Sequence, residues 1–227
     1  AQLLSLDANG NNDTSPDFDP SNIGQFGWDG WDWVGASDII MNFGGNLKGI
    51  SPDYKTAGLT SQAVKDAYQF EYDMVWKYYV RPNGEQIGAL FADDPMSPGI
   101  VANWEIQSWI EYAYPTWDEA FNWDVAAIPS QNGLIQAQAD FDIFTITKSS
   151  KHPKEAWEVA KWLLEPEQMK RLAPSYGCIP ARKSLAANWL EEKKAAYPNV
   201  DWQVVIDAMQ YADFPVTLEA ARECLQD

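Results

Sequence analysis

The stretch 24–45, GQFGWDGWDWVGASDIIMNFGG, sets three tryptophans among closely spaced glycines and aspartates. Glycines at this density destabilise a helix interior, and the aspartates interrupt the apolar face that a buried strand needs. We therefore expect Trp28, Trp31 and Trp33 on a loop or at a helix start. Their rings can stack on the C–H faces of sugars, with Asp29 and Asp32 accepting hydrogen bonds from hydroxyls, or they can anchor the loop to the core.

A second tryptophan group, Trp104 and Trp109, favours the carbohydrate interpretation. Tryptophan is also the outlier of the composition, with 12 copies beside 10 Tyr and 9 Phe in 227 residues. The formal charge of −17 repels nucleic acid and anionic lipid, which makes both poor partners. A hydrophobic content of 46% is ordinary for a globular chain with room for one large domain or two small ones.

The ionisable residues show no pattern of metal-dependent or nucleophilic catalysis. The single histidine, His152, leaves no His-rich metal site and no Ser–His–Asp triad centred elsewhere. Cys178 and Cys224 lie far apart and outside any zinc spacing, so we expect two small buried hydrophobic residues rather than a disulfide. We predict no metal and no cofactor.

The polar stretch after Leu6, DANGNNDTSPDFDPSN, is dense in turn-forming residues. Its series from Asp7 to Asp13 is similar to the start of a calcium loop. However, Asn12 and Phe18 stand where an EF-hand pattern has Gly and Glu. We predict a plain polar loop, with calcium binding as the alternative.

The rest of the chain mixes helical and strand-like segments, with helices in the majority, which predicts an α/β class. Two apolar runs are too short for helices and are bounded by turns, which predicts neighbouring buried strands at Ile100–Trp104 and Asn122–Ile128. Phe141–Thr147 alternates like a third strand. Helices are expected over 36–43, 61–79, 85–91, 107–114, 156–164, from Pro166 onward, 185–196, 201–212 and 217–225.

Three stretches together resemble the extracellular solute-binding proteins of sugar ABC transporters, the maltose-binding-protein-like group. Residues 60–82 are similar to the helix before the group's variable loop. In residues 91–129, a short segment leads to Trp109, although PGIVAN replaces the usual Gly-Lys-Ala-Met run, and NWDVAAIP follows at 122–129. The third stretch is the most specific: FDIFTITKSSKHPKEAWEVAKWLLEPEQMKRLAPSYGCIPARKSL.

The resemblance implies a periplasmic-binding-protein-like fold of type II, of which this chain is an incomplete piece lacking the first lobe. Residues 1–141 and 186–227 then belong to the second lobe. Residues 142–185 cross the hinge and pack on the first lobe. Apolar side chains such as Trp157 and Leu164 are accordingly expected to be exposed here.

The resemblance also implies a function without catalysis. Such a protein binds a sugar or oligosaccharide between two lobes and delivers it to an ABC permease in the membrane. It acts as a monomer in the periplasm or on the extracellular face, secreted or lipid-anchored. The ligand-binding residues that we expect are Trp109, Trp31, Trp33, Asp140, Phe141 and Tyr176.

The alternative is a glycoside hydrolase, because this chemistry needs two facing carboxylates and the chain is rich in both tryptophan and acid. Its candidate carboxylates are Asp29, Asp32, Glu105 and Glu111. With 33 Asp and Glu residues, however, some pair is always available, so this signal has little specificity.

Overall fold

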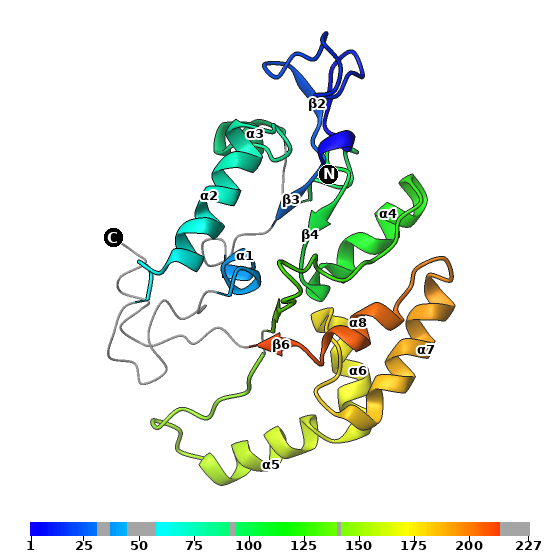
Figure 1. The fold of residues 1–227 in the computed structure, drawn as a ribbon. Helices are drawn as coiled ribbons and strands as arrows, with labels where there is room; N and C mark the ends of the chain where they lie inside the picture. The colour runs from blue at the N-terminus through cyan, green and yellow to red at the C-terminus, as the bar shows by residue number, and fades with distance from the viewer. Residues whose placement is uncertain (31–36, 45–57, 91–93, 140–141, 214–227) are drawn as a thin grey trace. The chain divides into compact units, whose positions relative to one another are not determined.

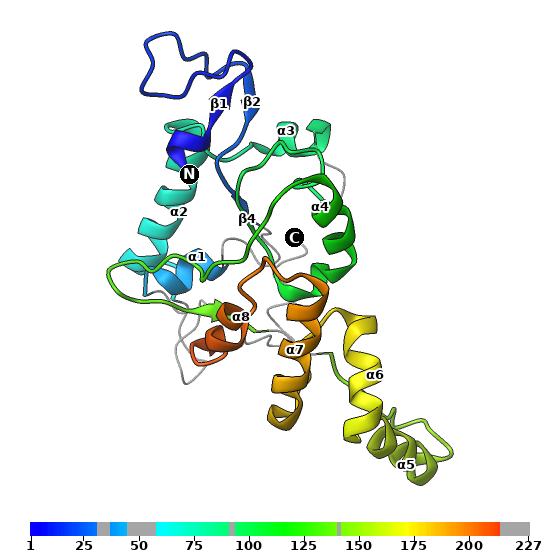
Figure 2. The same ribbon diagram turned by 90° about the vertical axis from the view of Figure 1, so that its right-hand side faces the viewer.

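The computed structural model describes residues 1–30, 37–44, 58–90, 94–139 and 142–213 (Figure 1). These residues form two compact units. The described residues of unit 1 lie within 1–106, 128–139 and 210–213. Those of unit 2 are 107–127 and 142–209. Figure 2 shows the same elements from the side.

Unit 1 combines helices with strands of only two or three residues. Its helices are η1 (Gln2–Leu4), α1 (Ser37–Asn42), α2 (Gln62–Trp76) and α3 (Gly84–Leu90). β1 (Leu6–Asp7) pairs antiparallel with β2 (Ile23–Gln25). β3 (Asp29–Gly30) pairs in parallel with β4 (Trp104–Glu105), and β5 (Ala137–Gln138) pairs in parallel with β6 (Ala212–Asp213).

The core of unit 1 lies where α1 meets α2. Ser61 caps α2 by accepting a hydrogen bond from the Val64 amide at 3.4 Å. Val64 then packs in a buried cluster with Ile39 and Ile40, and the partly buried ring of Trp28 packs against it. Trp28 is therefore an anchor of its segment.

Residues 26–30 form an extended segment rather than the loop or helix start that the sequence suggests. Phe26 donates a hydrogen bond to the carbonyl of Ile100 at 2.7 Å, and Ala102 donates to the carbonyl of Phe26 at 2.9 Å. Ile100–Trp104 is thus extended and partly strand, as predicted, but Val101 is its only buried residue. Its partner, however, is the segment 26–30 and not Asn122–Ile128.

Unit 2 is helical in its described residues. Its elements are η2 (Ser108–Ala113), α4 (Tyr114–Ala120), α5 (Pro153–Leu163), α6 (Pro166–Tyr176), η3 (Lys183–Leu185), α7 (Ala186–Ala196) and α8 (Gln203–Ala208). α6 and α7 lie side by side in both views (Figures 1 and 2). No described helix in either unit is long and apolar enough to cross a membrane.

The core of unit 2 is a cluster of aromatic rings centred on Tyr114. The centroid of its ring lies 5.0 Å from that of Trp123, 5.5 Å from those of Trp117 and Trp202, and 5.8 Å from that of Tyr197. Trp202 is only 1% exposed. Packed aromatic rings bury large areas and gain from edge-to-face contacts. Several tryptophans therefore stabilise the fold, which weakens the argument from their number to a sugar site.

Three predicted elements of this region differ in the structure. Asn122–Ile128 contains no strand residue, and the amide of Val125 donates to the Asp124 carboxylate at 2.8 Å. The described residues 142–147 are not a strand either, and all of them are exposed. Pro115 does not end a helix but stands in the first turn of α4, where its missing N–H is no loss.

Candidate functional site

The candidate site in unit 2 lies on η2, the 3₁₀ helix that begins one residue after Gln107. Trp109 and Tyr112 stand three residues apart, and in a 3₁₀ helix side chains at this spacing eclipse one another. Their rings are accordingly nearly parallel, with an interplanar angle of 27° and centroids 6.3 Å apart. Tyr112 is 62% exposed, whereas Trp109 is partly buried.

The indole N–H of Trp109 donates a hydrogen bond to the Gln107 side chain at 3.0 Å. Since it already has a protein partner, the main contribution that Trp109 offers to a ligand is the apolar surface of its ring.

The opposite side of η2 fixes the position of these rings. Ile110 is 1% exposed and Ala113 is 4% exposed, so both are part of the core. Glu111 forms an ion pair with Lys193, whose ammonium lies 5.9 Å from the centroid of the Tyr114 ring. A cation held over an aromatic face and paired with a carboxylate is well compensated for its burial.

The end of α6 supports η2 from a second direction. α6 ends at Gly177, which has a φ of 61°, and a Cβ at this position would lie 2.6 Å from the carbonyl oxygen of Trp109. Tyr176, a predicted site residue, immediately precedes Gly177 and is 48% exposed. The fold therefore brings the chain around Tyr176 against the backbone of Trp109.

The cysteine that follows Gly177 is a free thiol without signs of reactivity. Burial, followed by the charges of Asp142 and Glu111, raises the pKa of Cys178. A thiol with a raised pKa is a poor nucleophile. Cys224 lies outside the described residues.

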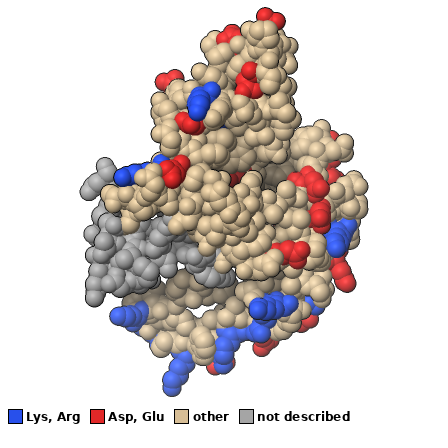
Figure 3. All heavy atoms as spheres, in the orientation of Figure 1, with Lys and Arg blue, Asp and Glu red and all other residues tan. Residues whose placement is uncertain are grey.

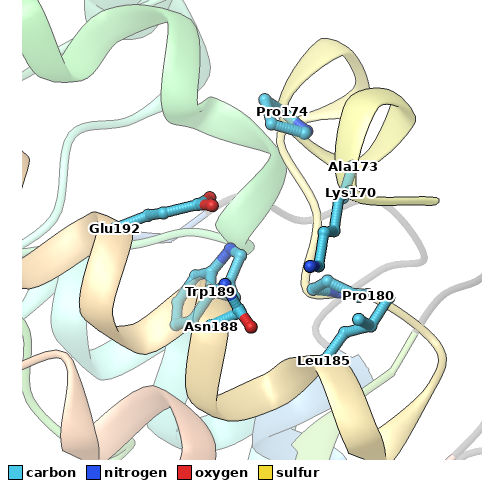
Figure 4. A pocket seen from close by; sticks show the side chains of 8 residues that line it. All are labelled: Lys170, Ala173, Pro174, Pro180, Leu185, Asn188, Trp189 and Glu192. Carbon is cyan, nitrogen blue, oxygen red and sulfur yellow. The ribbon is translucent and has the colours of Figure 1, made fainter. Parts of the chain in front are cut away.

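A small pocket of unit 2 does not have the size of a sugar site (Figure 4). Its volume is about 10 Å³, which is room for about one water molecule. It lies between α6 and α7, where Lys170 and Glu192 point in from opposite sides. We assign it no ligand.

In unit 1, the segment that leads to residues 31–36 is held by a buried arginine. Arg81 donates hydrogen bonds to the Asp29 carboxylate at 3.2 Å and to the Gly30 carbonyl at 2.9 Å. It also forms an ion pair with Glu71, and its guanidinium carbon lies 5.3 Å from the centroid of the Trp28 ring. Asp29 is 5% exposed, so it is a structural residue and not an acceptor for sugar hydroxyls.

The remaining predicted site residues, Trp31, Trp33, Asp140 and Phe141, lie outside the described residues, as does Asp32. Sequence reasoning missed Tyr112. Its spacing of three residues from Trp109, within a segment expected to be helical, was the signal that could have identified it.

The predicted polar loop of unit 1 is organised by the buried carboxylate of Asp7. Asp7 accepts hydrogen bonds from the amides of Asn9, Asn11 and Asp19 at 2.8, 2.9 and 3.0 Å. Within the described ranges, no group of three or more His, Cys, Asp or Glu side chains is placed to hold a metal ion. The Asp7 carboxylate, which would be the first calcium ligand, instead accepts hydrogen bonds from backbone amides of the loop.

The profile of the family described as bacterial extracellular solute-binding protein matches residues 7–201. The chain belongs to this family. The family is one of extracellular proteins that bind solutes rather than one of enzymes. No curated protein matches the chain.

Two solved structures of solute-binding proteins share the fold. One is the ABC substrate-binding protein Lmo0181 from Listeria monocytogenes in complex with cycloalternan, with a TM-score of 0.69 at 14% identity over 88% of this chain. The other is UspC from M. tuberculosis, with a TM-score of 0.66 at 18% identity over 94% of this chain. The chain spans 50% and 53% of their lengths.

As a solute-binding protein, the chain has no need of the carboxylate pair that the hydrolase alternative required. Two of the candidates for that pair are engaged in the fold. Asp29 is bound to Arg81, and Glu111 is bound to Lys193. The family assignment thus replaces the hydrolase alternative, and the two ion pairs show what these acids do in the fold.

Proposed function

We propose that the protein binds a sugar or oligosaccharide between two lobes and delivers it to an ABC permease. The observation that carries the sugar assignment is the pair of stacked rings on η2, Trp109 and the exposed Tyr112. Flat aromatic surfaces suit the C–H faces of sugar rings. The cycloalternan bound to Lmo0181, a protein of the same fold, supports the same class of ligand.

The proposal includes a first lobe that is not in this sequence. The chain covers only about half of each fold neighbour, which supports this division. Residues 1–141 and 186–227 then belong to the second, type II lobe, and 142–185 cross the hinge. Trp157 and Leu164 are 54% and 39% exposed, as we expected of a segment that packs on the first lobe.

The surface of this crossing segment has the composition of an interface. Ile143 is 76% exposed and Trp162 is 50% exposed. In α5 such apolar side chains alternate with charged ones, and Lys and Arg gather along the lower edge of Figure 3, where Figure 1 places α5. Several exposed apolar side chains beside charged ones are typical of a surface that another part of a protein covers.

The ligand contacts in this proposal come from Trp109 and Tyr176 in unit 2 and from Trp31, Trp33, Asp140 and Phe141. We propose a monomer that works in the periplasm or on the extracellular face, secreted or lipid-anchored. Two lobes that close over a ligand give affinity through contacts on both sides.

A glycan array followed by calorimetry tests this function on the protein extended by its first lobe. We expect tight binding of at least one sugar, and much weaker binding by the 227-residue chain alone, because half of the contacts and the closing motion are missing. Binding of no glycan by the extended protein would contradict the sugar assignment. Equal affinity of the short chain would contradict the two-lobe account.

A further inference from the structure

We infer that residues 147–154, TKSSKHPK, form a basic turn that contacts an anionic lipid bilayer. The turn leads into α5 in unit 2 and is separate from the candidate sugar site on η2. A bilayer contact here goes beyond ligand delivery, because it holds an extracellular protein at the cell surface in a fixed orientation.

The charge of the chain is unevenly distributed along its length. Residues 148–183 carry 8 of the 16 Lys and Arg but only 4 of the 33 Asp and Glu, which gives this segment a net charge of +4 in a chain of −17. A strong charge asymmetry of this kind indicates a surface for a polyanion. In Figure 3, Lys and Arg gather along the lower edge, where Figure 1 places α5.

The lysines at the start of this segment are not neutralised by the fold. Farther along, Lys161 pairs with Glu158 at 2.7 Å. Three exposed lysines of the basic turn, by contrast, form no ion pair with any described residue: Lys148, Lys151 and Lys154. Their charges are therefore available to an external partner.

The stability of the folded chain does not explain these positions. Lys154 stands in the first turn of α5, where the helix dipole disfavours a cation. Lys148 and Lys151 precede it within a few residues, and like charges at this spacing repel one another. An anionic surface against the turn offsets both unfavourable terms.

The acids elsewhere in the chain do not cancel this local charge at physiological ionic strength. The Debye length is about 8 Å at 0.15 M salt, so a bilayer that approaches the turn experiences chiefly the charges nearest to it. The whole-chain charge of −17, which makes anionic lipid a poor partner on average, acts on approaches from other directions. The same charge therefore favours one orientation at the bilayer.

The residue types favour a bilayer over an acidic protein. Protein interfaces are depleted in Lys and enriched in Arg and aromatic residues, whereas the basic turn has three lysines and no Arg, Phe, Tyr or Trp. Lysine ammonium groups are flexible point charges, which suit a fluid layer of lipid phosphates without fixed geometry. The turn also lacks the large apolar side chains with which the neighbouring α5 is proposed to pack on the first lobe.

The test is co-sedimentation with vesicles, using the protein extended by its first lobe and produced without a lipid anchor. The probes are vesicles of phosphatidylcholine alone and vesicles with about one third phosphatidylglycerol, in about 0.1 M NaCl, where the Debye length is about 10 Å. One variant combines Lys148→Gln, Lys151→Gln and Lys154→Gln. Melting curves of all proteins check that they are folded.

A matched control variant removes the same number of positive charges from exposed lysines elsewhere. It combines Lys65→Gln, Lys77→Gln and Lys194→Gln. The single variant Lys151→Gln keeps the test decisive if the triple variant of the basic turn is unstable.

We expect the unsubstituted protein to bind the vesicles with phosphatidylglycerol and not the neutral ones. Each lysine near an anionic surface strengthens binding by about fivefold, so Lys151→Gln should lose about fivefold and the triple variant of the turn on the order of 100-fold in partition coefficient. The control variant should stay within about threefold of the unsubstituted protein, and about 1 M NaCl should abolish binding.

Several results would overturn the bilayer contact. These are no binding to the anionic vesicles, equal binding to neutral vesicles, or equal losses in the two triple variants. Retention on immobilised polyglutamate without vesicle binding would instead assign the basic turn to an acidic protein. Because the measurement involves no sugar, its failure leaves the proposed function standing, and failure to bind glycans leaves the bilayer contact standing.

Discussion

Gly177, the residue that ends α6, packs directly on the backbone of Trp109. A Cβ at position 177 would lie 2.6 Å from the Trp109 carbonyl oxygen and 3.1 Å from its Cα. The φ of 61° also places Gly177 in the left-handed region, where a side chain is disfavoured. Two separate requirements for glycine thus coincide where α6 meets the candidate site.

Replacing Gly177 with alanine should destabilise the chain and displace η2. We expect about 1–2 kcal/mol from the backbone conformation and about 1–3 kcal/mol more from the steric contact. Urea unfolding of the chain measures the sum. Calorimetry on the protein extended by its first lobe should show weaker sugar binding, because Trp109 moves.

Gly133→Ala is the matched control for this substitution. Gly133 has a φ of 80°, but a Cβ there would meet nothing within 4 Å. The control should lose only the backbone contribution of about 1–2 kcal/mol and keep its affinity. Equal effects of the two substitutions would show that contact with Trp109 has no energetic importance.

Arg81 should be the most sensitive charged residue of unit 1. Its side chain is 7% exposed, and Arg81→Met leaves the buried Asp29 and Glu71 carboxylates without their cation. Breaking a buried ion pair from one side costs about 3–5 kcal/mol, and chemical denaturation measures this loss.

Lys77→Met provides the comparison for Arg81 in the same part of the chain. Lys77 follows the end of α2 and pairs with Asp73 at 3.4 Å, but its side chain is 58% exposed. Exposed pairs contribute little, so the melting temperature should hardly change. A loss as large as that of Arg81→Met would contradict the importance that we give to burial.

Asp7 should make the stability of its loop depend on pH in the acid range. Burial opposes its ionisation, but the hydrogen bonds from Asn11, Asp19 and Asn9 outweigh it, and the pKa of Asp7 is lowered from the ordinary 3.8. The folded state therefore favours the carboxylate. This stabilisation is complete above about pH 3.8 and is lost as the pH falls through the lower pKa of the folded state.

Asp7→Asn should lower the melting temperature near neutral pH, since an amide cannot accept all of the bonds that the carboxylate accepts. Below the folded-state pKa of Asp7, the difference from the unsubstituted chain should shrink. Asp17→Asn, at an exposed position of the same loop, is the control and should leave the melting profile unchanged. A difference that stays constant across the acid range would exclude a role for the Asp7 charge.

Most helices were predictable here, whereas the strands were predictable only in part. α2 has a capping serine and apolar residues at helical spacing, and α5 and α6 each start at a proline, so local signals suffice for them. A strand depends on a distant partner. Asn122–Ile128 has the right residues, but its Asp124 side chain also accepts a hydrogen bond from the Asp201 amide at 2.7 Å, a contact that no local pattern reveals.

Of the candidate site, sequence reasoning named Trp109 and Tyr176. The family resemblance pointed to both, whereas the stacked position of Tyr112 follows from the 3₁₀ conformation of η2. The contact with Gly177 joins segments 68 positions apart. The tryptophan count could not separate ligand surface from core, because Trp202 and Trp117 have the same chemistry as Trp109 but fill the aromatic cluster of unit 2.

Trp109 and Trp202 therefore form an informative pair of substitutions. Trp202 is 1% exposed and donates its indole N–H to the Tyr197 carbonyl at 3.2 Å, so Trp202→Ala should cost about 3–5 kcal/mol of stability. Trp109→Ala should instead leave the protein folded and weaken sugar binding by about 1–4 kcal/mol. Melting curves and calorimetry on both variants, in the protein extended by its first lobe, make the comparison. Unchanged affinity with a collapsed melting temperature in Trp109→Ala would remove Trp109 from the site and assign it to the core.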